Sequence, residues 1–276
     1  MTTGNKPHFT LGNAASIDEV IEQMNLLIEW SIQNQSRLGY FAALYRLVTI
    51  QVKQGIRTGY FEDGPRMERL DVVFANRYLD ALKAYFHGLP VSESWQLAFA
   101  QADNPRLLVL QHLLLGMNAH INLDLGIASA QTCPGETIHA LHQDFLAINR
   151  ILASLVDEVR SDIDRISPWI GLLDHVSPTA SKALINFSME KARDAAWDFA
   201  LSLAPLPEEQ ITAYCHEKDK QVYSIGNLVY RPPGIIFQTG LFLIRLREST
   251  DIGKNIRLLQ ERTAPPVSDS GQPFSM

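Results

Sequence analysis

Cysteine is scarce in this chain, and long apolar runs are missing from it. Two cysteines among 276 residues, Cys133 and Cys215, form no C-x-x-C pair, which argues against a disulfide scaffold or a zinc ribbon and favours a reducing compartment. No uninterrupted apolar run reaches the roughly 18 residues of a membrane-spanning helix, and residues 1–16 lack the basic start and apolar core of a signal peptide. We therefore expect a cytoplasmic protein with no membrane partner.

An excess of positive charge is also absent. The net charge is -6 and the pI is about 5.7, and no run of Lys and Arg is interleaved with aromatic residues, so we expect no nucleic-acid partner. The sequence contains no nucleophile elbow, no phosphate-binding loop, no dinucleotide fingerprint and no H-E-x-x-H. The common hydrolase, kinase, dinucleotide-binding and zincin classes are therefore not indicated, and no substrate is identified.

What the chain does contain is helical periodicity, with 46% hydrophobic residues to fill a core. Ser16, followed three residues later by Glu19, is typical of a capped helix start. No alternating strand pattern exceeds a few residues. These features predict an all-α, single-domain multi-helix bundle over residues 1–263, with a disordered or surface-draped tail over 264–276. Helices are expected at about 17–34, 38–56, 66–86, 106–129, 136–160, 179–203, 208–220, 235–248 and 251–263, with a loop or irregular segment at 224–234.

The segment 106–129 is the buried helix around which we expect the bundle to form. It is nearly all apolar, yet it carries five polar residues, and a buried polar group is costly unless it is paired, hydrogen-bonded or bound to a metal. His120 precedes Asp124 by one helical turn, a spacing that allows the two side chains to act together. The five polar residues are His112, Asn118, His120, Asn122 and Asp124.

Neighbouring helices supply three inward-leaning charges. Asp71 lies in the apolar stripe of the helix 66–86, so we predict that it is buried and paired. Asp144 lies at the margin of the apolar face of 136–160, and Arg193 leans inward from 179–203. The expected pocket contains the catalytic residues His120, Asp124 and Arg193, the ligand-binding residues Asp71, Tyr78, Asn118 and Trp197, and a metal set of His120, Asp124, Asp71 and Asp144.

Three interpretations of the His120–Asp124 pair remain open. In one, the pair binds a divalent metal as cofactor. In another, Asp124 orients the imidazole of His120 for acid–base chemistry. In the third, the charges form a structural network in which Arg193 neutralises Asp71 or Asp144.

Other polar and aromatic residues are expected to be structural. Asn118 and Asn122 point away from His120, so packing hydrogen bonds to another helix are favoured over ligand contacts. His112 reads as a core histidine and His139 as a surface residue. The tryptophans Trp95, Trp169 and Trp197 are predicted to lie in the core, and the apolar run 234–244 is predicted to be a core or docking helix.

Two segments resemble an uncharacterised family of soluble helical proteins classed as a domain of unknown function. They are Phe74-Ala75-Asn76-Arg77-Tyr78-Leu79-Asp80 and Gly116 to Leu125 with its N-A-H-I-N-x-D-L motif, followed by Asp144-Phe145 and Asn149. The resemblance covers about 38–197 and implies a shared site around His120 and Asp124, but no activity. A looser similarity is to helical zinc-dependent phospholipases and nucleases, which would imply a hydrolase. Those enzymes use a second H-x-x-x-[DE], which is missing here.

The function expected from these residues is that of an enzyme of unknown reaction acting on a small, partly apolar metabolite. His120 would serve as acid–base group or metal ligand, Asp124 would orient it or join it on the metal, and Arg193 would hold an anionic group. The alternative is a non-catalytic helical binding or scaffold protein. The oligomeric state stays open.

Overall fold

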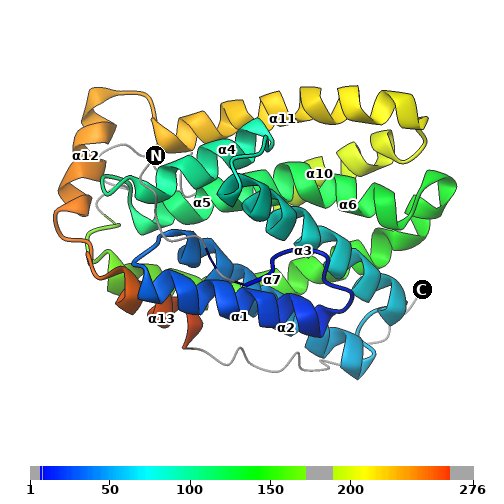
Figure 1. Cartoon of the computed structure of the whole chain (residues 1–276), viewed down its shortest axis with the longest axis horizontal. Helices are drawn as coiled ribbons and strands as arrows, with labels where there is room; N and C mark the ends of the chain where they lie inside the picture. The colour runs from blue at the N-terminus through cyan, green and yellow to red at the C-terminus, as the bar shows by residue number, and fades with distance from the viewer. Residues whose placement is uncertain (1–6, 8, 172–188, 262–276) are drawn as a thin grey trace.

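The computed structural model describes residue 7 and residues 9–171 and 189–261, and these residues form packed helices without a β-strand (Figure 1). The predicted all-α class is confirmed. None of the described helices combines the length and apolar character needed to cross a membrane. The α-helices are α1 (Ile17–Gln33), α2 (Leu38–Thr58), α3 (Gly64–Phe86), α4 (Glu93–Ala100), α5 (Val109–Ala119), α6 (Leu125–Thr132), α7 (His142–Ile166), α10 (Met189–Leu203), α11 (Glu208–Tyr230), α12 (Ile235–Arg245) and α13 (Ile252–Gln260).

Side-chain caps begin the first and third helices. The Ser16 hydroxyl accepts a hydrogen bond from the Glu19 N–H, and the Glu19 carboxylate accepts one from the Ala15 N–H, so the predicted cap of α1 is confirmed. Asp63 caps α3 by accepting from the Arg66 N–H, and this cap starts the helix two residues before the predicted start at residue 66.

Two helices begin later than their apolar patterns predict. α5 begins at Val109, because the carboxylate of Glu248 accepts the Val109 N–H and the Gln111 side chain accepts the Leu108 N–H. Residues 135–141 form a 3₁₀ turn, η3 (Gly135–Leu141), and α7 starts only at His142. At α5, therefore, a side chain that is distant in sequence helps to set where the helix begins.

The predicted loop over 224–234 is wrong for residues 224–230, because α11 continues to Tyr230, whereas residues 231–234 form a non-helical link to α12. Val222, Gly226 and Val229 are spaced at helical intervals and are buried, since α11 packs on α4 and α5. A Cβ added at Gly226 would lie 2.9 Å from a methyl carbon of Leu97, so this side of α11 is closely packed. The start of the predicted helix 179–203 and the tail 264–276 lie outside the described residues.

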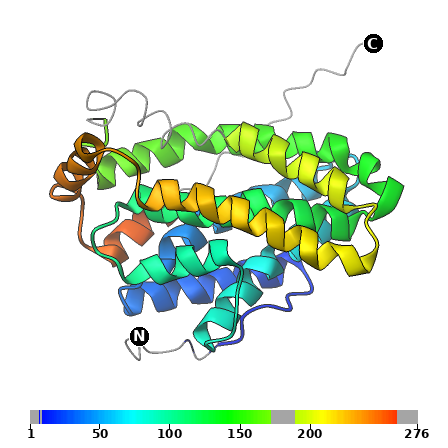
Figure 2. The same cartoon turned by 90° about the horizontal axis from the view of Figure 1, so that it is seen from above.

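α5, the turn η2 (His120–Asp124) and α6 run between the other helices. α5 contacts α2, α4 and α11, whereas α6 contacts α3 and α10. Figure 1 shows α11 along one edge of the molecule and α1, α2 and α13 along the opposite edge, and Figure 2 shows the same bundle from above. All five polar side chains of the segment 106–129 are buried, as predicted.

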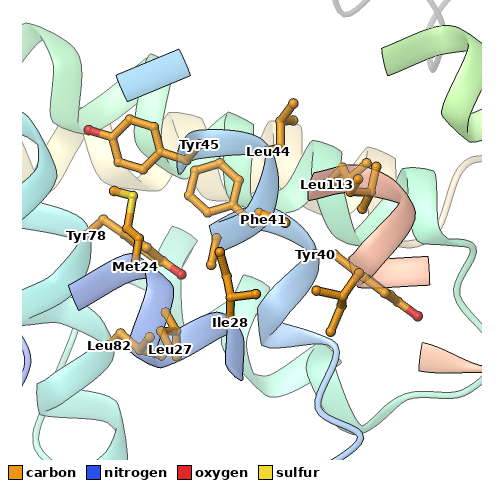
Figure 3. Close-up of a cluster of buried hydrophobic side chains, with 14 of the residues drawn as sticks. Met24, Leu27, Ile28, Tyr40, Phe41, Leu44, Tyr45, Tyr78, Leu82 and Leu113 are labelled. Atoms are coloured by element: carbon orange, nitrogen blue, oxygen red, sulfur yellow. The ribbon is translucent and has the colours of Figure 1, made fainter. Parts of the chain in front are cut away.

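Two glycines allow aromatic rings to approach the backbone of this segment. A Cβ at Gly116 would lie 2.6 Å from Cγ of Phe41, and one at Gly126 would lie 2.5 Å from Cδ1 of Phe199. Only glycine leaves room for such contacts without displacement of the ring. Phe41 thereby packs against α5 and joins the buried cluster of α1, α2 and α3 side chains seen in Figure 3, which also contains Tyr45 and Tyr78.

Candidate functional site

A cavity of about 470 Å³ lies between α2, α3, α5, α7 and α10. Its wall is largely aliphatic and aromatic, and it includes the buried polar side chains of Asp71, His120 and Arg193. Arg160 and Asp164 on α7 also line it and are exposed, so they mark where the cavity reaches the surface. The apolar wall includes Phe41, Tyr45, Val48, Phe74, Leu113 and Ile148.

His120 is held by aromatic rings rather than by hydrogen bonds. Its imidazole stacks on Phe74 with a centroid distance of 3.6 Å and an interplanar angle of 7°, and Tyr45 meets it edge-on at 4.3 Å. Neither ring nitrogen has a hydrogen-bond partner within the described part of the chain. Burial lowers the pKa of His120 and Asp124 only partly offsets this effect, so the imidazole is neutral at pH 7.

His120 and Asp124 lie in a π-helical turn. The Leu125 N–H donates to the carbonyl of His120, five residues earlier, which widens the helix at η2. His120 Nδ1 lies 3.6 Å from Oδ2 of Asp124, which is close enough for electrostatic interaction but too long for a hydrogen bond. The pair therefore interacts while the imidazole stays free to bond to something else.

Asp124 has two strong partners, and neither was assigned to it from the sequence. Its Oδ1 accepts from Arg77 Nε at 2.8 Å, and its Oδ2 accepts from Trp95 Nε1 at 2.8 Å. Burial alone would raise the pKa of Asp124, but Arg77, His120 and Trp95 outweigh this effect and hold the pKa below its usual value. Asp124 is thus an ionised carboxylate. Arg77 lies at the border of the apolar stripe of α3. In the sequence, the feature that pointed to Arg77 was the segment 74–80, which resembles the helical family.

Asp71 is buried, as predicted, but the predicted pairing is wrong. It is 6% exposed, and its Oδ2 has no hydrogen-bond partner in the described ranges. Burial, with a contribution from Glu68, raises the pKa of Asp71 to about 8. At neutral pH the cavity wall therefore carries a protonated carboxylic acid, which is a hydrogen-bond donor as well as an acceptor.

Arg193 reaches the cavity from α10 and is fixed by α7. Its Nε donates to Asn149 Oδ1, its Nη2 donates to the carbonyl of Phe145 at 2.6 Å, and its guanidinium carbon lies 4.4 Å from the centre of the Phe145 ring. Burial lowers the pKa of Arg193 to about 9, so it remains mainly cationic at pH 7. No carboxylate of the described residues forms an ion pair with it, so the expected neutralisation of Asp71 or Asp144 by Arg193 is wrong.

Asp144 belongs to a different part of the molecule. Its carboxylate accepts from the N–H groups of Glu62 and Asp63 at 2.7 and 3.1 Å and from Arg66 Nη2 at 2.6 Å, which ties the start of α7 to the start of α3. It does not line the cavity.

The expected metal set of His120, Asp124, Asp71 and Asp144 is not brought together. Over residues 9–171 and 189–261, no group of three or more His, Cys, Asp or Glu side chains is arranged to hold a metal ion.

Asn118 joins helices rather than facing the cavity. Its amide donates to the carbonyl of Val222 on α11 at 2.8 Å and accepts from Asn122 at 3.0 Å, which are the packing hydrogen bonds expected for this pair.

Tyr78 and Trp197 also lie outside the cavity lining. Tyr78 packs against Trp95 in the buried aromatic cluster, and Trp197 packs on His142 and Phe145. Trp169 is 43% exposed, so its predicted core position is wrong.

The chain belongs to the family of unknown function DUF5995, whose model matches residues 17–232. This match confirms the resemblance to an uncharacterised helical family, and it supplies no activity. Searches of curated proteins and of solved structures gave no match to the chain.

Proposed function

We propose that this DUF5995 protein binds a small, mostly apolar molecule in the cavity, with a polar end group of that molecule at Asp71, His120 and Arg193. The observation that carries the proposal is a cavity of about 470 Å³ whose apolar wall contains the unpaired Asp71 Oδ2, the unpaired His120 nitrogens and the cationic Arg193. Binding sites for small molecules typically have about this volume, an apolar lining and a few polar groups that orient the ligand.

The unpaired groups favour a bound molecule over an empty space. A buried polar group without a partner costs about 1–3 kcal/mol, so such groups are rare unless something else satisfies them. Asp71 Oδ2 and both nitrogens of His120 are in this state, and they come from α3 and η2. A ligand that reaches both would remove these costs on binding.

The charges of the wall indicate the chemistry of the ligand. Arg193 is cationic, Asp71 is a neutral acid and His120 is a neutral imidazole, so an anionic or strongly accepting end group is favoured over a cationic one. The remaining wall suits a hydrocarbon chain or ring. A monocarboxylate with an apolar body has both properties.

Dodecanoate is a suitable probe, with dodecylamine as its counterpart of opposite charge. Isothermal titration calorimetry should show binding of dodecanoate and at least about tenfold weaker binding of dodecylamine. Val48 lines the cavity, so Val48→Phe should fill it and weaken dodecanoate binding at least about tenfold. Ile50→Phe is the matched control, because Ile50 lies on the same helix outside the cavity lining. Absence of binding by the wild type, or equal binding by the two variants, would refute the proposal.

Acid–base catalysis on the bound molecule is the second candidate function. It is favoured by the opposite shifts that burial produces in the pKa values of Asp71 and His120, which leave one group able to donate a proton and the other able to accept one at neutral pH. The test is mass spectrometry of molecules extracted from the wild type and from His120→Phe after identical purification. A catalyst should yield different molecules from the two proteins, distinguished by mass or, for isomers of equal mass, by chromatographic retention, whereas identical molecules would contradict catalysis and leave binding as the function.

A further inference from the structure

The end of the bundle at α12 has an apolar surface that no described residue covers. α12 buries Phe237, Leu241 and Ile244 against α5 and the residues before it, and its opposite side points outward. Ile235 is 84% exposed and Phe242 is 60% exposed. We call the outward surface the α12 face; it consists of the exposed apolar residues of α12 and its C-terminal end, Ile235, Ile236, Phe242, Leu243 and Leu246. Figures 1 and 2 show α12 at one end of the molecule, away from α6.

The stretch of sequence that contains the α12 face differs in the sign of its charge from the whole chain. Residues 221–247 contain three arginines and no Asp or Glu, although the chain has a net charge of -6. Arg231 and Arg247 are exposed, and the guanidinium of Arg247 lies 5.0 Å from the ring centre of the half-exposed Trp169. The third arginine, Arg245, donates to the carbonyl of Pro105. The apolar segment is therefore bounded in sequence by two exposed arginines that form no ion pair within the described residues, and an indole lies under one of them.

The arginines and the tryptophan indicate what kind of partner covers this apolar surface, a second copy of the chain or a lipid bilayer. A second copy of the chain would place Arg231 and Arg247 near their own counterparts in a two-fold interface, where like charges repel. A bilayer with anionic headgroups complements the arginines, accepts the apolar side chains below the headgroups and favours tryptophan at the interface. The charge pattern favours the bilayer.

We propose that the α12 face docks on the surface of an anionic lipid bilayer, with its apolar side chains at the boundary of headgroups and acyl chains and with Arg231 and Arg247 on lipid phosphates. This docking is peripheral, since α12 has only the residues Ile235–Arg245 and lies on the surface of the bundle. It is also independent of the cavity ligand, although Ile170 both lines the cavity and packs against the apolar cluster under α12.

Co-sedimentation of the full chain with vesicles tests the proposal. The wild type should bind vesicles of phosphatidylcholine and phosphatidylglycerol at least about tenfold better than vesicles of phosphatidylcholine alone, and added salt should weaken the binding. Phe242→Ser should lower the partition into the mixed vesicles at least about fivefold. Leu89→Ser is the matched control, because Leu89 is 59% exposed but lies between α3 and α4.

A double variant that removes two positive charges distinguishes charge-dependent docking from nonspecific binding to vesicles. Arg231→Gln combined with Arg247→Gln should lower binding to the mixed vesicles several-fold, whereas Arg57→Gln, at an exposed arginine of α2, should leave it unchanged. The folded state of each variant is checked by circular dichroism. Equal behaviour of Phe242→Ser and Leu89→Ser, or no binding of the wild type to the mixed vesicles, overturns the proposal. A dimer seen by light scattering and lost in Phe242→Ser also overturns it, because a second copy then covers the face.

Discussion

Asp144 and Asp71 both have buried carboxyl groups, and the surroundings of these groups are opposite. Asp144 accepts hydrogen bonds from two backbone N–H groups and from Arg66, and it joins α3 to α7. Asp71 faces the cavity with an unpaired oxygen and a pKa raised to about 8 by burial. Asp144 holds two helices together, whereas Asp71 places a polar group in the wall of the cavity. Burial alone therefore does not distinguish these two groups, but the completeness of their hydrogen bonding does.

The same contrast occurs within one helical turn of η2. Asp124 is satisfied by Arg77 and Trp95, so it fixes α6 to α3 and α4. His120 lies 3.6 Å from that carboxylate, and neither of its ring nitrogens has a hydrogen-bond partner among the described residues. We infer that Asp124 is the rigid, charged support of the site and that His120 is the group left available to a ligand.

The largest expected effect comes from removal of the satisfied carboxylate. Asp144→Ala leaves Arg66 and two backbone N–H groups without their acceptor, so the free energy of unfolding should fall by about 3–5 kcal/mol. Urea denaturation followed by circular dichroism measures this change. Asp164→Ala, at an exposed position of the same helix, is the control and should change stability by less than about 0.5 kcal/mol. A loss below about 1 kcal/mol in Asp144→Ala would contradict the structural role.

A medium effect, with a defined pH dependence, is expected at Asp71. Its folded pKa of about 8 exceeds the value of about 3.9 in an unfolded chain, so between these values the folded state keeps a proton that the unfolded state has released. The contribution of Asp71 to stability should therefore fall as pH rises through this window and level off above pH 8.

The variant Asp71→Asn cannot titrate and isolates this contribution. The stability of the wild type relative to the variant should decrease by roughly 2–3 kcal/mol between pH 5 and pH 7, measured by urea denaturation at each pH. Asp164→Asn serves as the exposed control. A pH-independent difference between wild type and Asp71→Asn would show that Asp71 is ionised and paired in the folded protein.

Much of the secondary structure was predictable because it depends on local patterns. The Ser16 cap and the spacing of apolar residues define α1, and the apolar stripe of α3 places Asp71 in the interior. The start of α5 was not predictable, because it is set by Glu248, which is distant in sequence. The extension of α11 depends in the same way on its packing against α4 and α5.

The spacing of the His120–Asp124 pair was predictable, but its hydrogen-bond partners were not. Helical spacing places His120 and Asp124 together, and burial of both follows from the apolar segment around them. Helical spacing does not indicate which neighbouring helices meet them, and the hydrogen-bond partners of Asp124 are Arg77 of α3 and Trp95 of α4. The cavity itself has no sequence signal, because Val48 and Phe74 follow the same apolar pattern whether they meet another side chain or an open space.

The smallest expected effect on stability is at His120. Its size decides whether His120 resembles Asp144 and Asp124, which have hydrogen-bond partners, or Asp71, which has an unpaired oxygen. His120→Phe keeps a ring on Phe74 and Tyr45 and removes two unpartnered nitrogens, while Asp124 retains Arg77 and Trp95. The free energy of unfolding should therefore change by no more than about 1 kcal/mol, with a small gain favoured. Urea denaturation at pH 7 measures it, and Asp124→Asn, which weakens the bond to Arg77, should lose more. A loss above about 2 kcal/mol in His120→Phe would place the imidazole in a structural network, because only a group that makes stabilising contacts costs that much to replace by a ring of similar shape.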